Sequence, residues 1–440
     1  GYVGNLSDEH KDKLYEMWRA YFVACDDAKG DKKQGGGEME FSEESDPTKL
    51  GIPQDDAAKE EAKKRMEEQG MRDLLSQYGS EALRDTYWSF CKADNPDTTM
   101  LRFLRARKWD VSRAMAMLAT CLKWRLDSGV EDLARAGDYG NFQSIPKFSE
   151  QQNTGKIFAQ GATANEAPIC YVRLKKHFTF GQPASTMLKF IIFQMETWRL
   201  FMVPPQDKMT ILFDLDGFGV RNCDVVALLN VVKCLEAYFP ESLEKMFIHR
   251  APWIFSQIWK MIKGLLDPVV RNKIAFTSNV QGLNETIPSD RLLEWVKGSV
   301  TNDFVWMEPT AEENALLKDT AERDRRWDRH RALADEFEKL TRRWSVDGGK
   351  DPTLNEQREI LVKKLRLSQF ELEPYTRGRT IHHRNGTLPL ANPGMVKWDY
   401  IQKDGEKLRQ IIGHKESRKS MIYELLAIQD GASVDDAEAK

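Results

Sequence analysis

The sequence has none of the short motifs that mark the common hydrolases, nucleotide-binding enzymes and zinc peptidases. GxSxG, GxxxxGK[ST] and HExxH are all absent from its 440 residues, and each would supply a nucleophile, a phosphate loop or a metal site. Gly217 and Gly219 begin a dinucleotide-binding fingerprint, but Asn222 stands where the third glycine belongs. We therefore expect a protein that is not an enzyme, and a hydrolase is the weakest alternative.

Cysteine and histidine are sparse and poorly spaced for disulfide or metal chemistry. The six cysteines include no CxxC pair, and no cysteine or histidine falls at the spacing of a zinc site. His382 and His383 form the one close histidine pair, in a loop-like stretch rich in Arg, Asn and Gly. These patterns predict free thiols in a reducing compartment, with no metal and no other cofactor.

The chain also lacks a strong charge of one sign and any long apolar run. Its formal net charge is −3, whereas a nucleic-acid-binding protein usually carries a clear basic excess. No apolar run approaches the ~20 residues that cross a bilayer, and the opening GYVGNLSDEH has no apolar signal-peptide core. We expect a soluble cytoplasmic protein without a nucleic-acid partner.

Shifts in composition predict five segments along the chain. The second of them is rich in Asp, Glu, Lys and Gly, which is typical of a linker. In chain order the segments are an N-terminal helix (1–25), a flexible charged linker (26–56), an N-terminal helical region (57–130), an α/β domain (131–305) and a helical C-terminal extension (306–440).

Short apolar runs alternate with helical patterns between residues 131 and 305. The runs expected to be strands are 155–160, 168–174, 208–215, 242–249 and one that starts at 274. The segments expected to be helices are 183–201, 223–239 and 288–296. This alternation predicts an α/β domain with a largely parallel or mixed sheet. Asp214 and Asp216, at the end of the third run, are expected to point apart.

The C-terminal extension is dense in charge but keeps apolar residues at helical spacing. Residues 312–344 and 354–370 each carry such a seam, which indicates that they bury a surface on this chain or on another. Residues 396–428 are also expected to be helical. These helices are therefore a candidate surface for a protein partner.

A short, strongly apolar segment follows the run at 242–249. Ala-Pro at 251–252 and Asp-Pro at 267–268 bracket a helix at 254–266 that is apolar around most of its circumference. Such a helix is either sealed in a core or covers something apolar that is not protein. We expect a mobile gate helix, whose apolar residues are Trp253, Ile254, Phe255, Trp259, Leu265 and Leu266.

Four motifs occur in a fixed order along the chain. They are LRFLRARKWD at 101–110, Tyr-x-Pro-Glu at 238–241, Ala-Pro-Trp at 251–253, and Leu-Asp-Pro at 266–268 followed by Lys273. In this order they resemble the CRAL-TRIO lipid-transfer family, in particular its fungal phosphatidylinositol-transfer branch and the CSR subgroup. The resemblance implies a non-catalytic fold whose sheet floors a lipid cavity.

The resemblance also implies which residues meet the phosphatidylinositol headgroup. Arg107, Glu241 and Lys273 match the family's headgroup positions, and Lys108 belongs to the basic cluster around Arg107. On spacing alone, this basic cluster is expected to be a solvated face. The resemblance instead implies that Arg107 binds phosphate. Val270 stands where a relative has a threonine that contacts the headgroup, which predicts a weaker or water-assisted contact.

Apolar composition and the resemblance together predict the walls of the cavity. The expected lining residues are Phe190, Phe193, Met209, Ile211, Phe213, Phe247, Ile258, Met261 and Ile262. Met209 and Ile211 replace a serine and a threonine with which a relative binds phosphatidylcholine, so that lipid should bind poorly. A second apolar ligand such as squalene or a sterol could take the freed space.

The sequence therefore predicts a cytoplasmic protein, peripheral on membranes, that binds phosphatidylinositol and exchanges it between them. Its partners would be phospholipid and, transiently, a membrane surface. The alternative is a lipid-sensing scaffold that presents its C-terminal helices to a protein partner.

Overall fold

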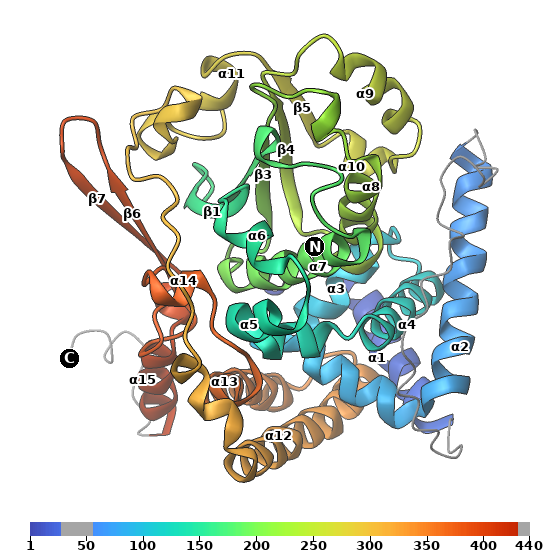
Figure 1. Ribbon diagram of the computed structural model, residues 1–440. Helices are drawn as coiled ribbons and strands as arrows, with labels where there is room; N and C mark the ends of the chain where they lie inside the picture. The colour runs from blue at the N-terminus through green and yellow to red at the C-terminus, as the bar shows by residue number, and fades with distance from the viewer. Residues whose placement is uncertain (28–55, 430–440) are drawn as a thin grey trace. The chain divides into compact units, whose positions relative to one another are not determined.

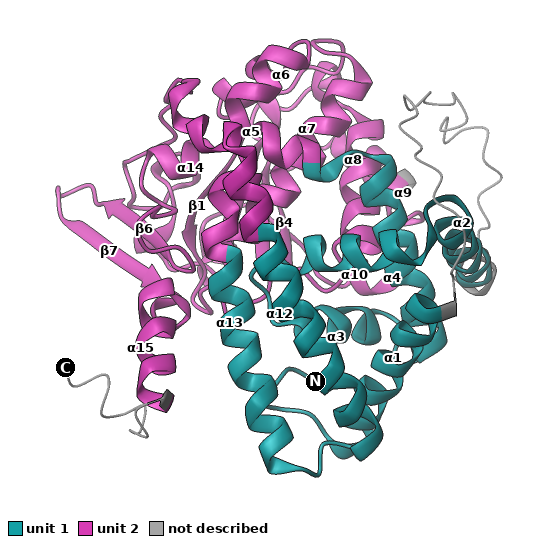
Figure 2. Ribbon diagram, turned by 90° about the horizontal axis from the view of Figure 1, so that it is seen from below, with its two compact units in different colours: residues 1–131, 327–369 teal, residues 132–326, 370–440 magenta. Residues whose placement is uncertain are grey.

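The computed structural model describes residues 1–27 and 56–429. The linker expected at 26–56 lies almost entirely outside this described part. The chain divides into two compact units (Figure 2): unit 1 comprises residues 1–131 and 327–369, and unit 2 comprises residues 132–326 and 370–440. The extension expected at 306–440 therefore contributes residues to both units.

Unit 1 is built from helices around an aromatic core. The ring of Trp18 lies 5.6 Å from Phe22, 5.9 Å from Tyr87 and 5.8 Å from Phe337. Since Phe337 comes from the C-terminal extension, part of the apolar seam of that extension is buried on this chain. The helices of unit 1 are α1 (Asp8–Asp27), α2 (Asp56–Cys91), α3 (Pro96–Ala106), α4 (Val111–Asp127), most of α12 (Thr320–Asp347) and α13 (Pro352–Thr376) as far as Gln369.

Unit 2 contains the expected α/β fold, organised on a five-stranded mixed sheet of order β1-β2-β3-β4-β5 (Figure 1). β1 and β2 are antiparallel, and the remaining neighbours are parallel. Every residue of β2 and β3 is buried, which explains why these strands read as continuous apolar runs in the sequence. The strands are β1 (Ile157–Ala162), β2 (Pro168–Arg173), β3 (Met209–Asp214), β4 (Leu243–His249) and β5 (Ile274–Thr277).

Helices of unit 2 follow the expected alternation, with two differences. The helix expected at 223–239 is a shorter α8 that continues into a π-helical turn at Cys234–Tyr238, and the one at 288–296 is two short 3₁₀ turns. The α-helices are α5 (Val130–Ser144), α6 (Phe148–Asn153), α7 (Ala184–Trp198), α8 (Val225–Lys233), α9 (Phe255–Lys263), α10 (Pro268–Arg271), α11 (Gln281–Asn284), α14 (Ile381–Arg384) and α15 (Arg418–Gln429).

The helix expected over residues 396–428 is wrong for its first half. β6 (Val396–Ile401) and β7 (Lys407–Ile412) form an antiparallel hairpin, which Figure 1 shows beside β1. Along β6, buried residues alternate with more exposed ones, which is the period of a strand. Gly405, with φ +87°, makes the turn possible. The Asp-Gly step at 404–405 was the sequence signal for this hairpin.

Asp214 and Asp216 do not point apart, contrary to the expectation from strand alternation. The guanidinium of Arg250 lies 2.7 Å from an oxygen of Asp214 and 3.9 Å from an oxygen of Asp216. Residues two apart along a strand face the same side, so alternation does not separate this pair, and Asp216 moreover lies in the turn after β3, which ends at Asp214. The pair neutralises an arginine.

Candidate functional site: an apolar cavity in unit 2

The candidate site is an apolar cavity between the sheet and helices α7, α8 and α9. The space that the centre of a water molecule can occupy is about 100 Å³, and the empty space between the atoms is about 990 Å³ when its opening to solvent is included. Its walls include Ile211 and Phe213 from β3, Ile191 from α7, Leu228 from α8 and Ile258 from α9. A wall of this composition suits hydrocarbon chains, because it leaves few polar groups to be stripped of water.

Strand alternation decides which side chains of the sheet reach the cavity. Ile211 and Phe213 are two residues apart on β3, and both line the cavity. Ile248 of β4, which pairs with Phe213, lines it as well. Phe247 pairs with Leu212, so its side chain lies on the opposite face of the sheet. Phe247 is buried there and does not form part of the cavity wall.

The other residues expected to line the cavity have different surroundings. Phe190 and Phe193 on α7 contact the ring of Phe148 on α6, at centroid distances of 5.5 and 5.6 Å. Both sides of α7 are buried, so its apolar face alone could not show which residues meet the cavity. Met209 is buried at the start of β3, outside the cavity wall. The side chain of Met261 is outside the described part of the chain.

The segment that was expected to be a gate helix contains α9, and α9 is more amphipathic than the sequence pattern indicated. Phe255 and Ile258 line the cavity, and Ile262 packs with Leu266 against Val232 of α8. Trp259 contacts Phe276 at 5.0 Å. The expectation of apolar residues around most of the helix is wrong, because the opposite face carries four exposed polar residues: Ser256, Gln257, Lys260 and Lys263.

The residues that flank α9 explain why the sequence suggested a helix that is apolar around most of its circumference. Trp253 and Ile254 precede the helix, and Leu265 and Leu266 follow it, so these four residues do not share its circumference. Trp253 is 83% exposed, whereas Leu266 is buried. A large aromatic side chain in solvent beside an amphipathic helix is an arrangement suited to a membrane interface.

The expected headgroup residues Glu241, Val270 and Lys273 all belong to unit 2. Glu241 has a φ of +58°, at the turn that leads into β4. Val270 is buried in α10, and Lys273 is half-buried directly before β5. The backbone of Lys273 is fixed on both sides: its N–H donates to Val270 O at 3.0 Å and its carbonyl accepts from Met246 N at 2.9 Å.

Arg107 and Lys108 belong to unit 1, and their side chains differ sharply in environment. Arg107 is only 4% exposed, and its guanidinium donates to both carboxylate oxygens of Glu67, with Nε–O distances of 3.0 and 3.1 Å. Lys108 is exposed, with a φ of +50°. The guanidinium expected to bind phosphate is therefore already matched by a carboxylate within its own unit.

A polar group inside the cavity was missed at the sequence level. Lys156, directly before β1, lines the cavity together with His177 and Asp224. Lys156 Nζ lies 3.1 Å from His177 Nδ1, and His177 Nε2 lies 3.1 Å from Asp224 Oδ2. The available signal was weak: a lysine and a histidine at the edges of two apolar strands. Only the packing of α6, α7 and α8 brings the three residues together.

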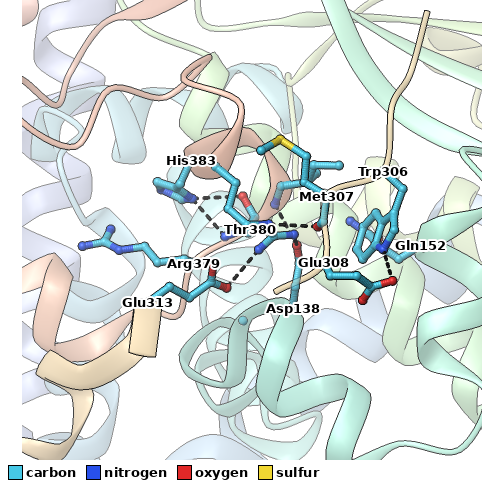
Figure 3. Close-up of polar contacts among 12 residues, drawn as sticks. Asp138, Gln152, Trp306, Met307, Glu308, Glu313, Arg379, Thr380 and His383 are labelled. Carbon is cyan, nitrogen blue, oxygen red and sulfur yellow. Dashed lines mark hydrogen bonds and ion pairs between the residues drawn. The ribbon is translucent and has the colours of Figure 1, made fainter. Parts of the chain in front are cut away.

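A second buried polar cluster joins α5 to the loop and helix around α14 (Figure 3). Arg384 donates to Asp138 at 2.6 Å and to Glu313 at 2.9 Å, and burial raises the pKa of Asp138 to about 6. His383 Nδ1 accepts from Thr380 N at 3.1 Å, which is a local capping contact. Among the described residues there is no group of three or more His, Cys, Asp or Glu side chains that could hold a metal ion.

No helix in the described parts of the chain is both long enough and apolar enough to cross a membrane.

Comparison with known proteins places the chain in a family. Residues 152–298 match the CRAL/TRIO domain, and residues 69–120 match the CRAL/TRIO N-terminal domain. The cavity, the sheet beneath it and helix α9 lie within the first of these matches. The chain belongs to the CRAL/TRIO family.

Two similar proteins, both fungal, span most of this chain. Phosphatidylinositol transfer protein CSR1 of Eremothecium gossypii is 36% identical over 325 residues, which is 73% of this chain and 74% of that protein. A CRAL-TRIO domain-containing protein of Schizosaccharomyces pombe is 31% identical over 340 residues, 75% of this chain and 76% of that protein. The crystal structure of Sfh5 gives a TM-score of 0.36 at 15% identity, covering 49% of this chain and 71% of that one.

Proposed function

We propose that this protein binds phosphatidylinositol in the cavity of unit 2 and exchanges it between membranes. The observation that carries the proposal is an apolar cavity closed on one side by a short amphipathic helix. The similarity to a phosphatidylinositol transfer protein over 73% of the chain supports the choice of lipid. The proposed activity is non-catalytic, and the proposed location is the cytoplasm and the surface of membranes.

Hydrocarbon burial supplies the driving force for such a complex. Each methylene moved from water to an apolar wall contributes roughly 0.8 kcal/mol. The water-sized space in the cavity is only about 100 Å³, which is too little for two acyl chains. Entry of a phospholipid therefore requires the cavity to widen, and we propose that the gate helix moves outward to allow it.

The gate helix has the features that this motion needs. In the closed form, Phe255 and Ile258 of its apolar face line the cavity and Ile262 packs against Val232 of α8; in the open form, lipid would cover this face. Lys260 and Lys263 on the exposed face would attract an anionic bilayer surface, and Trp253 would enter the interface. Contact with a membrane would thus favour the open form.

The headgroup would be held by the charged residues of unit 2 next to this helix in sequence. Lys273 would donate to the phosphate, and Glu241 would accept from hydroxyls of the inositol ring. Because Val270 is apolar, the phosphate would have one hydrogen-bond partner fewer than it would have with a threonine at this position. We do not extend the phosphate role to Arg107, because Glu67 already accepts from its guanidinium.

Phosphatidylcholine should be a poor substrate for transfer. Ile211 lines the cavity and Met209 lies behind it, and neither can donate to a choline phosphate. In a vesicle assay, labelled phosphatidylinositol is expected to move at least about tenfold faster than labelled phosphatidylcholine, the effect of about one missing hydrogen bond to a charged group. Equal rates for the two lipids would contradict the assignment.

A gain-of-function control sharpens this assay. Ile211→Thr places a hydroxyl in the cavity wall and makes the side chain one heavy atom smaller, so it should raise phosphatidylcholine transfer and leave phosphatidylinositol transfer near the parental rate. Thr210→Val is the matched control, because Thr210 is on the opposite face of β3 and bonds to Glu244 at 2.9 Å. It should change neither rate.

The scaffold alternative has no comparable support. Phe337 and Trp344, which the sequence offered as part of a partner surface, are buried in unit 1. Trp344 contacts Tyr15 of α1 at 4.5 Å, so this part of the seam is already occupied.

A further inference from the structure

The cavity of unit 2 is apolar except for a buried ammonium group. Lys156 is 3% exposed and is one of the residues that line the cavity. It donates to the side-chain oxygen of Gln151, lies 3.1 Å from His177 Nδ1, and lies 3.9 Å from the sulfur of Met187. Its first two protons therefore have good acceptors, whereas the third has only weak ones, the thioether of Met187 and the ring of Phe190 at 5.7 Å.

The charge of Lys156 is not cancelled by a direct ion pair within the described chain. The nearest compensating carboxylate is Asp224, and His177 stands between the two. Asp224 is itself committed, because one of its oxygens accepts from His177 and the other from Ala227 N at 2.8 Å, at the start of α8. The pairing with Asp224 leaves the imidazole proton on Nε2, so His177 Nδ1 accepts from Lys156.

The other polar side chains of the cavity bond to one another or to the backbone. Gln194 donates to Gln152 at 2.6 Å, and Asn222 donates to His177 O at 2.6 Å. Arg173 is paired with Asp303 and lies over the ring of Trp295 at 4.3 Å. Arg173 Nε is also buried without a hydrogen-bond partner, but the charge of its guanidinium is neutralised by Asp303, whereas the ammonium of Lys156 has no direct ion pair among the described residues.

We propose that Lys156 is the binding site for the carboxylate of a single-chain lipid acid, such as a long-chain fatty acid, whose hydrocarbon tail lies along the apolar cavity. The ammonium offers one proton and a net positive charge, which a small anion with two acceptor oxygens can use. A choline phosphate would need further partners that this wall does not offer. This ligand differs in kind from squalene or a sterol, because recognition depends on charge.

This proposal rests on the proposed function only in that it uses the same cavity. It does not depend on the binding of phosphatidylinositol. A long-chain acid would compete with an acyl chain of the phospholipid for the space beneath the gate helix. The protein would then carry either a phospholipid or a lipid acid, and the level of the acid would regulate phospholipid loading.

The test uses displacement of the fluorescent fatty acid cis-parinaric acid from the full-length protein at pH 7, with oleate and methyl oleate as competitors. The wild-type protein should bind oleate at least about tenfold more tightly than methyl oleate, the usual effect of a charge-assisted hydrogen bond. Lys156→Met keeps the side-chain length and removes the charge. It should lower oleate affinity by about tenfold and leave methyl oleate within about twofold.

Two controls separate a binding role from a structural one. Lys175→Met makes the same chemical change at an exposed lysine that pairs with Asp216, and it should leave both affinities unchanged. The preference for oleate should also fade as the pH rises past 8, because burial lowers the pKa of Lys156 to about 8 and the ammonium is lost above it. The charged groups facing this lysine are His177, Asp224 and Arg173, and of these Asp224 opposes the decrease.

Each outcome decides the proposal. Equal binding of oleate and methyl oleate by the wild-type protein, or an undiminished preference in Lys156→Met or Lys156→Gln, would overturn it. The two substitutions guard against one of them failing to fold. Phosphatidylinositol transfer is measured on the same preparations: loss of transfer with an intact carboxylate preference would sink the phosphatidylinositol assignment and leave Lys156 as the acid site.

Discussion

Replacing Lys273 with alanine is expected to slow phosphatidylinositol transfer between vesicles by at least about tenfold, because one charge-assisted hydrogen bond to the phosphate is lost. The fold should be retained. The backbone of Lys273 is held by hydrogen bonds to Val270 and Met246 that do not involve the side chain. A melting curve close to that of the parent protein would show that the loss concerns binding.

Lys403→Ala is the matched control for this variant. Lys403 is an exposed lysine of unit 2 in the hairpin turn between β6 and β7, where it lies 3.7 Å from Glu294. The same charge is removed far from the cavity in sequence and structure, so transfer should continue at the parental rate. Parental transfer by Lys273→Ala as well would remove this lysine from the headgroup site.

Replacing Arg107 with alanine is expected to destabilise the protein rather than to weaken lipid binding selectively. Arg107 and Glu67 are 4% and 3% exposed, and the guanidinium contacts both carboxylate oxygens. Removing one member of a buried pair leaves the other charge without a partner, which costs about 3–5 kcal/mol. The melting temperature should fall by several degrees, as measured by circular dichroism.

A double variant distinguishes the structural role from a phosphate-binding role. Arg107→Met with Glu67→Leu removes both charges and keeps the approximate volume, so it should recover most of the lost stability. If the pair is structural, the double variant should transfer phosphatidylinositol normally. A stable double variant without transfer would instead return Arg107 to the headgroup site that the family resemblance implied.

The strands and the gate helix could be predicted from the sequence for physical reasons that are visible in the structure. β2 and β3 are buried throughout, so their residues form continuous apolar runs with turn residues at each end. Pro252 and Pro268 mark the limits of the segment that contains α9. A proline interrupts a strand, and within a helix it is tolerated only in the first turn. The family resemblance added the expectation that the sheet floors a lipid cavity.

The environments of individual side chains were much harder to predict than the positions of the helices and strands. Both faces of α7 are buried, so Phe190 and Phe193 looked like cavity residues although they pack on Phe148. Phe247 belongs to a strand that is apolar on both faces, and only its register with Leu212 shows which face it occupies. Lys156 gave almost no signal, because its burial arises from three elements distant in sequence.

The most direct test of the central claim is the lipid that the protein carries when it is purified. Mass spectrometry of an organic extract should find phosphatidylinositol at close to one molecule per protein, enriched well above its share of the host membranes. An Ile258→Asp variant, which places a charge on the inner face of the gate helix, should lose this lipid. An extract of the parent protein without phosphatidylinositol, or with phosphatidylinositol no more abundant than in the membranes, would contradict the assignment of this cavity.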